Sequence, residues 1–519
     1  MDKGGMSLSG KTTMVQSTIL LALANFAIRG VSMAFQVYLT NAVGAAGLGL
    51  LQLILTVNGF ALTLGTSGIR VAAMYLSAEE YGLGRPQGIR QAMLWCMGTG
   101  LILSTIVGLG LAAAAELLAA NWVKDLQATD SLRLLGLTLP LTCASSILGG
   151  YFTACGKIGR LAIVEILDRL LSVFLTVGLL QFGIKGDLSH SCVSIIGGSA
   201  MSCALTVSVL LIMMLLDFRG LPPSSPSLDM GRRLRRFCMP VALNDYLRSG
   251  LGTLEQFLIP YGLTRCGGSR SSALADYGTI HGMVFPVMMF PVTVLLAVAD
   301  LLVPRLARCR ARQDTKGTTD LAERSLRYST LFATAVGGLL YVLSDGLGIL
   351  LYDSPQACRY LRLFAPLVPV LYLDCIVDGI HKGLGEQIYC VRVNTLTNLM
   401  DVVLLFLLLP RFGISGYYIT YTATHVINFY LSLRRLMMLT KPTLSLGFSL
   451  TTVSCVFTVT AAARIFLSPT NSWRTVLLQG SIYLATLSLL LTLTGIFDRD
   501  HGFNKTFTKT SRKIPCIRP

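Results

Sequence analysis

Long apolar segments alternate with short polar joints along the whole chain. A helix needs about 20 mostly apolar residues to cross the hydrocarbon core of a bilayer. Fourteen segments meet this length: 14–40, 46–77, 88–119, 131–153, 160–183, 190–217, 237–262, 274–304, 324–351, 361–384, 389–410, 415–438, 444–467 and 474–496. The pattern therefore predicts an all-α, polytopic membrane protein with about fourteen transmembrane helices.

Composition and the placement of charge agree with this fold class. The chain is 53% hydrophobic and only 13% charged, whereas a soluble domain carries about 25% charged residues. Lys and Arg collect in every second joint, as in RRLRR at 232–236 and PRLARCRAR at 304–312, and in the basic tail. Because Lys and Arg favour the cytoplasmic side, we expect both termini in the cytoplasm. We interpret the net charge of +17 as a consequence of the membrane topology, and we expect no nucleic-acid partner.

Polar residues of the first predicted helix recur in the seventh, at 237–262. NFAIRG at 25–30 resembles NDYLRSG at 244–250. Three pairs share an offset of 219 residues, and two glycine pairs share an offset of 229: Asn25 with Asn244, Arg29 with Arg248, Gln36 with Glu255, Gly150 with Gly379, and Gly156 with Gly385. Each half holds six predicted helices, an even number. We therefore expect two lobes related by a pseudo-two-fold axis along the membrane normal.

This repeat divides the chain into four predicted parts. They are an N-lobe at 1–220, a C-lobe at 221–441, two extra helices at 442–498, and a basic cytoplasmic tail at 499–519.

Ionisable residues within predicted spans are the candidate site residues, because charge in a membrane helix usually faces a cavity or a partner. Asn25, Arg29, Ser32 and Gln36 share one face of the first helix, and the seventh helix repeats this stripe with Asn244, Arg248 and Glu255. Either the two arginines line a central cavity and face each other across the axis, or they pair with Glu255 or with backbone carbonyls. Arg70, near the inner end of the second predicted helix, faces either the cavity mouth or the lipid headgroups.

Acidic residues in two further predicted helices suggest ion pairing or ion coupling. Glu165 and Arg169 are four residues apart and can pair on one helix, which leaves Asp168 on a neighbouring face. An internal ion pair and a cation or substrate site are both open for these three residues. Asp374 and Asp378 share a face of the helix at 361–384; they either bind Na⁺ or H⁺ or have a structural role.

Other chemistry is not expected. GMSLSGKT, from Gly5 to Thr12, has the letters of a phosphate-binding loop, but only four residues precede it and an apolar helix follows. A strand must lead into such a loop, so we expect no nucleotide site. The 13 cysteines are scattered without a C-x-x-C pair, and the five histidines are isolated. We expect no metal, no cofactor, no catalytic residue and hence no enzyme.

Three stretches, in this order, resemble a known family: RGVSMAFQVYLTNAVGAAGLGLLQLILTV, GGYFTACGK and RSGLGTLEQFLIPYGL. They are similar to the stage V sporulation protein B and polysaccharide-exporter branch of the multidrug/oligosaccharidyl-lipid/polysaccharide superfamily. MurJ-type lipid II flippases belong to the same superfamily. The resemblance implies two six-helix lobes, a central cavity, and export of an undecaprenyl-diphosphate-linked glycan across the bacterial cytoplasmic membrane by alternating access. It also implies that Arg29 matches a cavity arginine of lipid II flippases.

A cation-coupled multidrug antiporter of the same superfamily is the alternative function. Arginine suits a diphosphate, because its planar fork makes two charge-assisted bonds at once, whereas a cationic drug favours carboxylates. The last two predicted helices also favour a flippase, because the resemblance implies twelve helices for drug antiporters. We expect a lipid-linked glycan and membrane lipids as partners, with Na⁺ or H⁺ as the coupling ion left open.

Overall fold

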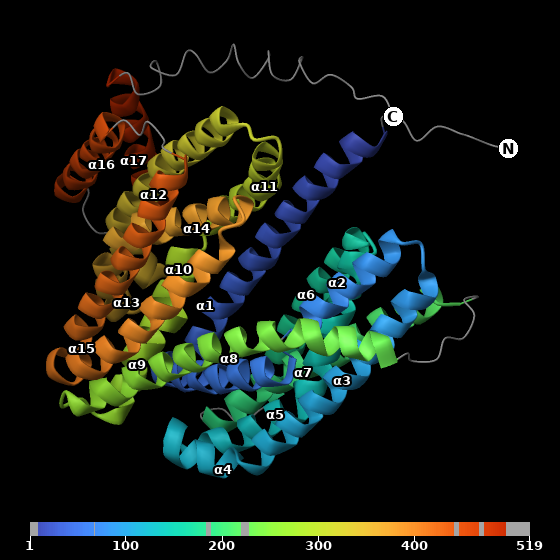
Figure 1. Cartoon of the computed structure of the whole chain (residues 1–519). Helices are drawn as coiled ribbons and strands as arrows, with labels where there is room; N and C mark the ends of the chain where they lie inside the picture. Colours follow the sequence, from blue (N-terminus) through green and yellow to red (C-terminus); the bar gives the residue numbers. More distant parts are fainter. Residues whose placement is uncertain are drawn as a thin grey trace. The chain divides into compact units, whose positions relative to one another are not determined.

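The computed structural model describes residues 9–66, 68–182, 188–219, 228–440, 446–466 and 472–494 (Figure 1). Within these ranges the regular elements are α-helices with short π and 3-10 turns, and no strand is present. Residues 5–8 of the loop-like match, the tail at 499–519 and the side chain of Asn25 lie outside the described part, whereas residues 9–12 of the match belong to the helix that begins at Ser9. The all-α fold class predicted from the sequence is confirmed.

Seventeen α-helices make up the described part of the chain. The first eight are α1 (Ser9–Thr66), α2 (Ile69–Gly82), α3 (Pro86–Ala113), α4 (Ala115–Leu118), α5 (Thr129–Ala154), α6 (Ile158–Phe182), α7 (Leu188–Asp217) and α8 (Leu228–Arg265). The others are α9 (Arg270–Gly278), α10 (Phe285–Met289), α11 (Val292–Ala311), α12 (Thr315–Tyr352), α13 (Pro355–Phe364), α14 (Val368–Gly383), α15 (Gln387–Thr440), α16 (Leu446–Phe466) and α17 (Trp473–Leu493). The described residues of each of the fourteen predicted apolar segments lie mainly on helical chain.

Two of the predicted joints are single glycines rather than loops. α1 contains the first predicted span and most of the second, and the chain turns at Gly44 with φ 76° and ψ 171°. α15 likewise contains the eleventh and twelfth, with a turn at Gly413 (φ 56°, ψ −134°). Glycine reaches these dihedral angles because it has no Cβ atom. The second predicted span is itself broken, because α1 ends at Thr66 and α2 begins at Ile69.

Eight helices of the described part are long and apolar enough to cross a membrane. The number is nine if Arg270–Met289 and Val292–Ala311, which meet at a 57° bend, form one span. α6 and α8 are not in this set, and each carries three or more ionisable residues in its predicted span. The exact number of fourteen spans therefore stays a prediction.

The chain forms two compact units. Unit 1 is Met1–Met283 with Asn398–Thr420, and unit 2 is Val284–Thr397 with Tyr421–Pro519. In unit 1, α3 packs on α5, α6 on α7, and α8 on α1, α2 and α3. α3 and α5 approach each other closely at Gly108, where an added Cβ would lie 2.3 Å from the carbonyl oxygen of Gly136. Larger side chains there would force the two helices apart.

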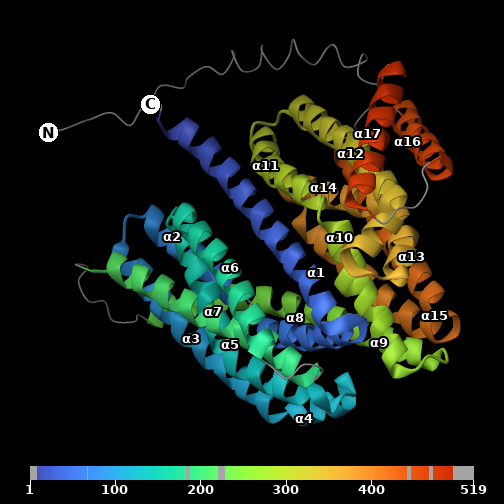
Figure 2. The same cartoon turned by 180° about the vertical axis from the view of Figure 1, so that it is seen from behind.

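Unit 2 is built around α12. This helix packs against α13, α14, α16 and α17, and α11 packs on α14. Figures 1 and 2 show α16 and α17 beside α12 from both sides. The apolar contact between these helices includes Val342, Leu343 and Val456, and the Tyr483 hydroxyl donates to the carbonyl of Ala335 at 3.2 Å.

The internal repeat appears in the backbone. Three positions with positive φ in unit 1 recur 229 residues later in unit 2: Gly84 (65°) with Gln313 (54°), Lys124 (55°) with Asp353 (47°), and Gly156 (72°) with Gly385 (72°). The backbone hydrogen bonds around the members of each pair also correspond. The axis that would relate the two halves, and the boundaries at 220, 441 and 498, stay predictions.

Candidate functional site

The break between α1 and α2 places the N-terminus of α2 inside unit 1, where Gly68 and Ile69 are buried. Gly68 precedes α2 with φ 74°, and its side-chain position is closed by α8, because a Cβ there would lie 2.9 Å from the carbonyl oxygen of Cys238. No side chain caps this helix end. The first N–H groups of a helix have no intrahelical acceptor and carry a partial positive charge. The start of α2 is therefore suited to an anion.

A pocket of about 440 Å³ lies at this break. Its walls come from the end of α1, the start of α2 and the middle of α8. The lining residues are Thr63, Thr66, Gly68, Arg70, Val71, Asp245, Arg248 and Ser249. The structure thus brings together Arg70 and Arg248, two of the predicted substrate-binding residues, and both side chains are exposed.

The pocket wall carries two positive charges and one negative charge, and a further carboxyl lies near Arg70. Arg70 lies in the first turn of α2, where a cation meets the positive end of the helix dipole at a cost of about 0.3–1 kcal/mol. Arg248 adds a second positive charge, and Asp245 is the one acidic residue in the wall. Glu165 of α6 also interacts electrostatically with Arg70. A phosphate bound at the N-terminus of α2 would accept from the backbone and from both guanidinium groups.

The polar stripe of the first predicted helix is partly engaged by its own unit. Arg29 is exposed and is not among the residues that line the pocket. Ser32 accepts a hydrogen bond from Nε of Arg169 on α6 at 2.9 Å. Gln36 donates to the carbonyl of Gly282 at 3.1 Å. Gly282 lies in the π-helical turn Thr279–Val284, so the Gln36 amide contacts an irregular stretch of helix.

No ion pair joins Glu165 and Arg169, one of the two possibilities left open by the sequence, among the described side chains. Arg169 reaches α1 instead, as its bond to Ser32 shows. Asp168 turns toward α7, where its Oδ1 accepts from Ser202 at 2.7 Å and from Thr206 at 2.8 Å. Neighbouring helices compete for these side chains, and the distance along one helix does not decide the outcome.

The other members of the α8 stripe lie away from the pocket lining. Asn244 is half-buried and does not line the pocket. Glu255 interacts electrostatically with Asp401, a buried carboxylate on α15. No ion pair joins Glu255 to Arg29 or Arg248 in the described part of the chain. The structure therefore gives no acidic partner of this kind to the two arginines.

A salt-bridge clamp fastens the start of α8 to α2. Arg233 donates to Glu80 at 2.9 Å and to Glu79 at 2.7 Å. The Glu80 side chain is only 5% exposed, whereas that of Arg233 is 40% exposed. Hydrogen bonding to Glu80 raises the pKa of the Arg233 guanidinium further above its usual range. The clamp holds α8, one wall of the pocket, against the helix that carries Arg70.

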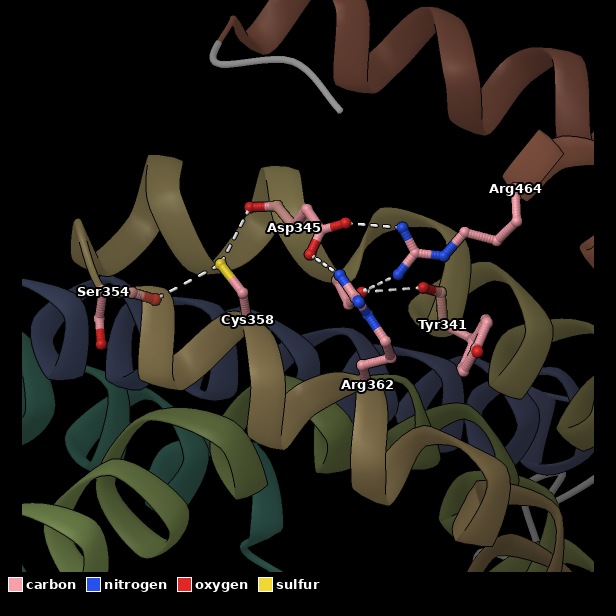
Figure 3. Close-up of polar contacts among 7 residues, drawn as sticks. Tyr341, Asp345, Ser354, Cys358, Arg362 and Arg464 are labelled. Carbon is pink, nitrogen blue, oxygen red and sulfur yellow. Dashed lines mark hydrogen bonds and ion pairs between the residues drawn. The ribbon is translucent and has the colours of Figure 1, made fainter. Parts of the chain in front are cut away.

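Unit 2 contains a second charged cluster, which the sequence analysis missed (Figure 3). Asp345 of α12 accepts from Arg464 of α16 at 2.6 Å and from Arg362 of α13. Arg464 also donates to the Ser344 hydroxyl at 3.1 Å and lies over the Tyr341 ring. The sequence does contain a signal for this cluster, because Arg464 lies near the end of the apolar span predicted at 444–467 and Asp345 lies in the span predicted at 324–351. The cluster ties α16 to α12.

Asp374 and Asp378, the remaining predicted ion residues, both lie on α14. Nδ2 of Asn428 donates to Asp374 Oδ2 at 3.0 Å. The structure gives neither carboxylate a basic ion-pair partner within the described residues. No group of three or more His, Cys, Asp or Glu side chains in that part of the chain is placed to hold a metal ion.

The helices long and apolar enough to span a membrane indicate a multi-pass membrane protein. The arginine-lined pocket in unit 1 is typical of a transporter. The chain belongs to the polysaccharide biosynthesis protein family, whose model matches residues 14–310.

Two curated relatives come from Bacillus subtilis (strain 168). Stage V sporulation protein B is 21% identical over 416 residues, which cover 78% of this chain and 80% of that protein. Sporulation protein YkvU is 19% identical over 363 residues, which cover 68% of this chain and 78% of that protein. The family resemblance predicted from the sequence is confirmed.

Solved structures share the fold at low identity. The lipid II flippase MurJ in an inward closed conformation has a TM-score of 0.74 and 12% identity, with 93% of this chain and 99% of that chain covered. An inward-facing multidrug resistance MATE family transporter of the MOP superfamily has a TM-score of 0.62 and 15% identity, with 81% of this chain and 99% of that chain covered. The chain therefore has the fold of this transporter superfamily.

Proposed function

We propose that the protein is a flippase that moves an undecaprenyl-diphosphate-linked oligosaccharide or peptidoglycan precursor across the cytoplasmic membrane by alternating access. The observation that supports this proposal most is the pocket with Arg70, Arg248 and the N-terminus of α2. Arg70 on α2, Arg248 on α8 and the uncapped N-terminus of α2 match the charge and the oxygen atoms of a diphosphate. The family and the fold agree with this substrate class.

In the proposed mechanism the protein holds its substrate by the diphosphate group. The guanidinium groups of Arg70 and Arg248 and the first N–H groups of α2 bind its oxygens. The glycan passes through the water-filled part of the transport path, and the prenyl chain stays in the lipid. Binding favours the opposite-facing state only if that state contacts the diphosphate better. Asn25, Arg29 and Arg169 are proposed to continue the polar path along α1 and α6, and whether Arg29 faces Arg248 stays a prediction.

The charge of the pocket argues against the multidrug antiporter alternative. A pocket with two arginines and one aspartate repels a cationic drug. The pair of Glu255 and Asp401 is the feature of unit 1 that would suit a cation, and we assign it to ion coupling rather than to drug binding. The coupling ion, Na⁺ or H⁺, is part of the proposal.

The cellular setting is proposed together with the function. We place the protein in the bacterial cytoplasmic membrane with both termini in the cytoplasm, because the basic joints lie on that side by the charge rule. Its partners are then the lipid-linked glycan and the surrounding lipids, without nucleotide, nucleic acid or catalytic chemistry.

Binding of undecaprenyl diphosphate to the purified protein in detergent tests the phosphate site. Charge-assisted hydrogen bonds contribute about 1.5–3 kcal/mol each, so Arg70→Ala or Arg248→Ala should weaken binding about 10- to 100-fold. Arg474→Ala on α17, an exposed arginine outside unit 1, is the matched control and should bind like the wild type. Unchanged binding in the Arg70→Ala, Arg248→Ala double variant would overturn the assignment of the pocket.

A further inference from the structure

Two cations from separate segments lie over one aromatic ring in unit 1. Lys124 follows the π-helical turn Ala119–Val123, and Arg265 is the last residue of α8. Nζ of Lys124 lies 4.9 Å, and Cζ of Arg265 lies 5.3 Å, from the centroid of the Tyr261 ring. Both distances are in the range of a cation–π contact. Like charges that share a ring repel each other, so an anion that contacts both would be stabilised.

Acidic side chains do not neutralise these two cations. Within the described residues neither Lys124 nor Arg265 forms an ion pair, and both side chains are exposed. The neighbouring carboxylate of Asp125 acts on Arg270, the first residue of α9, and accepts a hydrogen bond from the N–H of Gln127 at 3.0 Å. This end of unit 1 therefore carries an uncompensated positive charge.

The predicted topology does not account for this charge. Lys124 and Arg265 lie in the joints after the third and the seventh predicted spans, which the charge rule places on the outer side of the membrane. The joint after the eleventh span adds the exposed Arg411. This joint packs on the end of α8, because an added Cβ at Gly413 would lie 3.3 Å from Sγ of Cys266. Basic residues usually collect on the cytoplasmic side, so a cluster on the outer side needs another reason.

One face of α8 changes from apolar to aromatic to basic toward the end of the helix. Residues spaced by three, four and four positions share this face: Leu254, Phe257, Tyr261 and Arg265. Leu254 is 48% exposed, and the 46% exposed Trp122 meets Phe257 edge to face with 5.6 Å between the ring centroids. Trp and Tyr are typical of the membrane–water interface. A phospholipid shows the same order of apolar and charged groups from its acyl chain to its phosphate.

Lys124 reaches this place through an uncommon backbone conformation. Its φ of 55° and ψ of 30° are left-handed, a region that residues with a Cβ atom rarely adopt and that glycine usually occupies at a helix end. Asp353 has this conformation at the corresponding position of the repeat in unit 2. The repeat therefore fixes the turn and leaves the charge free to differ. Strained residues cluster at functional sites, which supports a role in binding for the lysine.

We propose that an anionic phospholipid binds at this end of unit 1, with its phosphate in contact with Lys124 and Arg265 and an acyl chain along Phe257 and Leu254. The phosphate oxygens accept charge-assisted hydrogen bonds from the ammonium and the guanidinium group. A zwitterionic phospholipid carries its own cation beside the phosphate and gains less from the site. Binding of this lipid does not rest on the proposed function.

Arg270 is a positioning residue for this site. Its guanidinium group donates to the carbonyl of Val123 and so ties the turn that precedes Lys124 to the start of α9. Loss of Arg270 would move the turn as well as remove a charge. The test therefore keeps Arg270 and changes only the two cations that contact the phosphate.

Quenching of Trp122 fluorescence by lipids with brominated acyl chains tests the site. The purified protein is placed in phosphatidylcholine vesicles that contain a small fixed fraction of one brominated lipid. The chain has three tryptophans, so the signal of Trp122 is the part that Trp122→Phe removes, and each variant is measured with and without this substitution. Two cations should give brominated phosphatidylglycerol an advantage of about 10- to 30-fold in relative affinity over brominated phosphatidylcholine.

Two double variants locate the preference. Lys124→Gln, Arg265→Gln should be quenched equally by the two brominated lipids, because the charges that hold the phosphate are gone. Arg359→Gln, Arg474→Gln removes two exposed basic residues of unit 2 on the same predicted side of the membrane. This matched control should keep the full preference for phosphatidylglycerol.

Three results would overturn the proposal. Equal quenching of the wild type by both lipids would do so without reference to any variant. A preference that persists in Lys124→Gln, Arg265→Gln at the wild-type melting temperature would place the lipid elsewhere. Relief of the quenching by undecaprenyl phosphate at far lower concentration than phosphatidylglycerol, with no relief by undecaprenol, would assign the site to a carrier lipid. Loss of glycan transport with the lipid preference intact would refute the proposed function alone.

Discussion

Gly156 and Gly385 lie 229 residues apart and have the same φ of 72°. Each follows the C-terminus of a helix, α5 in unit 1 and α14 in unit 2, and each is flanked by the same set of backbone bonds. Lys157 N–H donates to the carbonyl of Phe152, as Glu386 N–H does to His381. Both helices therefore end in the same left-handed cap. This identity supports descent of the two halves from one duplicated unit.

Replacement of Gly156 by alanine should lower stability through the backbone alone. No atom lies within 4 Å of an added Cβ at this position, so the cost is that of a left-handed residue, about 1 kcal/mol. The apparent melting temperature in detergent measures it. Gly178→Ala in the C-terminal part of α6, where an added Cβ also meets nothing within 4 Å, is the control and should be neutral or stabilising. Equal changes in melting temperature for the two substitutions would contradict the left-handed cap at Gly156.

Removal of Arg233 should destabilise unit 1 more than removal of its neighbour Arg232. Without Arg233 the nearly buried Glu80 loses its partner, which costs about 1–3 kcal/mol once the exposure of the arginine is taken into account. The Arg232 side chain is 70% exposed and reaches Asp229 at only 3.7 Å, so Arg232→Ala should be close to neutral. In Arg233→Ala, Glu80→Gln should restore part of the lost melting temperature. No restoration would show that the clamp does not act through Glu80.

Arg464→Ala should loosen α16 from α12. The arginine joins Asp345 and Ser344 to the C-terminal helix pair, and its loss leaves Asp345 with Arg362 alone. We expect faster labelling of a thiol introduced in the contact, for example at Val456, which is 8% exposed. Arg474→Ala on α17 should leave the labelling rate unchanged. A wild-type rate in Arg464→Ala would mean that apolar packing alone holds the helix.

Most of the fold could be predicted from the sequence, because apolar length and basic joints report directly on membrane helices. The break at Gly68 was not predicted, although GTSG at 65–68 is a helix-breaking stretch. Apolar residues on both sides made the segment look continuous. The turns at Gly44 and Gly413 fall in the joints between predicted spans, and a sequence pattern does not show that one glycine is enough for such a turn.

The candidate site was predicted only in part. Arg70 and Arg248 were named, and the structure places both around one pocket. For Glu165, Asp168 and Arg169 the sequence left an ion pair and a cation or substrate site open, and the structure shows Arg169 bonded to Ser32 on another helix. Such contacts depend on how each helix is rotated about its axis and shifted along its neighbour. Packing sets this rotation and this shift, and a single sequence does not show them.

Lysine should replace the two pocket arginines only partly. The ammonium group keeps the charge but cannot make two parallel bonds to a diphosphate. We expect Arg70→Lys and Arg248→Lys to bind undecaprenyl diphosphate more tightly than the alanine variants and more weakly than the wild type. Full binding by both lysine variants would show that charge alone recognises the ligand.

Surface labelling of the lipid-linked precursor, in cells whose own flippase has been depleted, tests the central proposal most directly. Cells that produce the wild-type protein or Arg474→Ala should export the precursor and grow. Cells that produce the Arg70→Ala, Arg248→Ala double variant, at equal membrane levels, should show labelling at background. Wild-type labelling with the double variant would contradict the account.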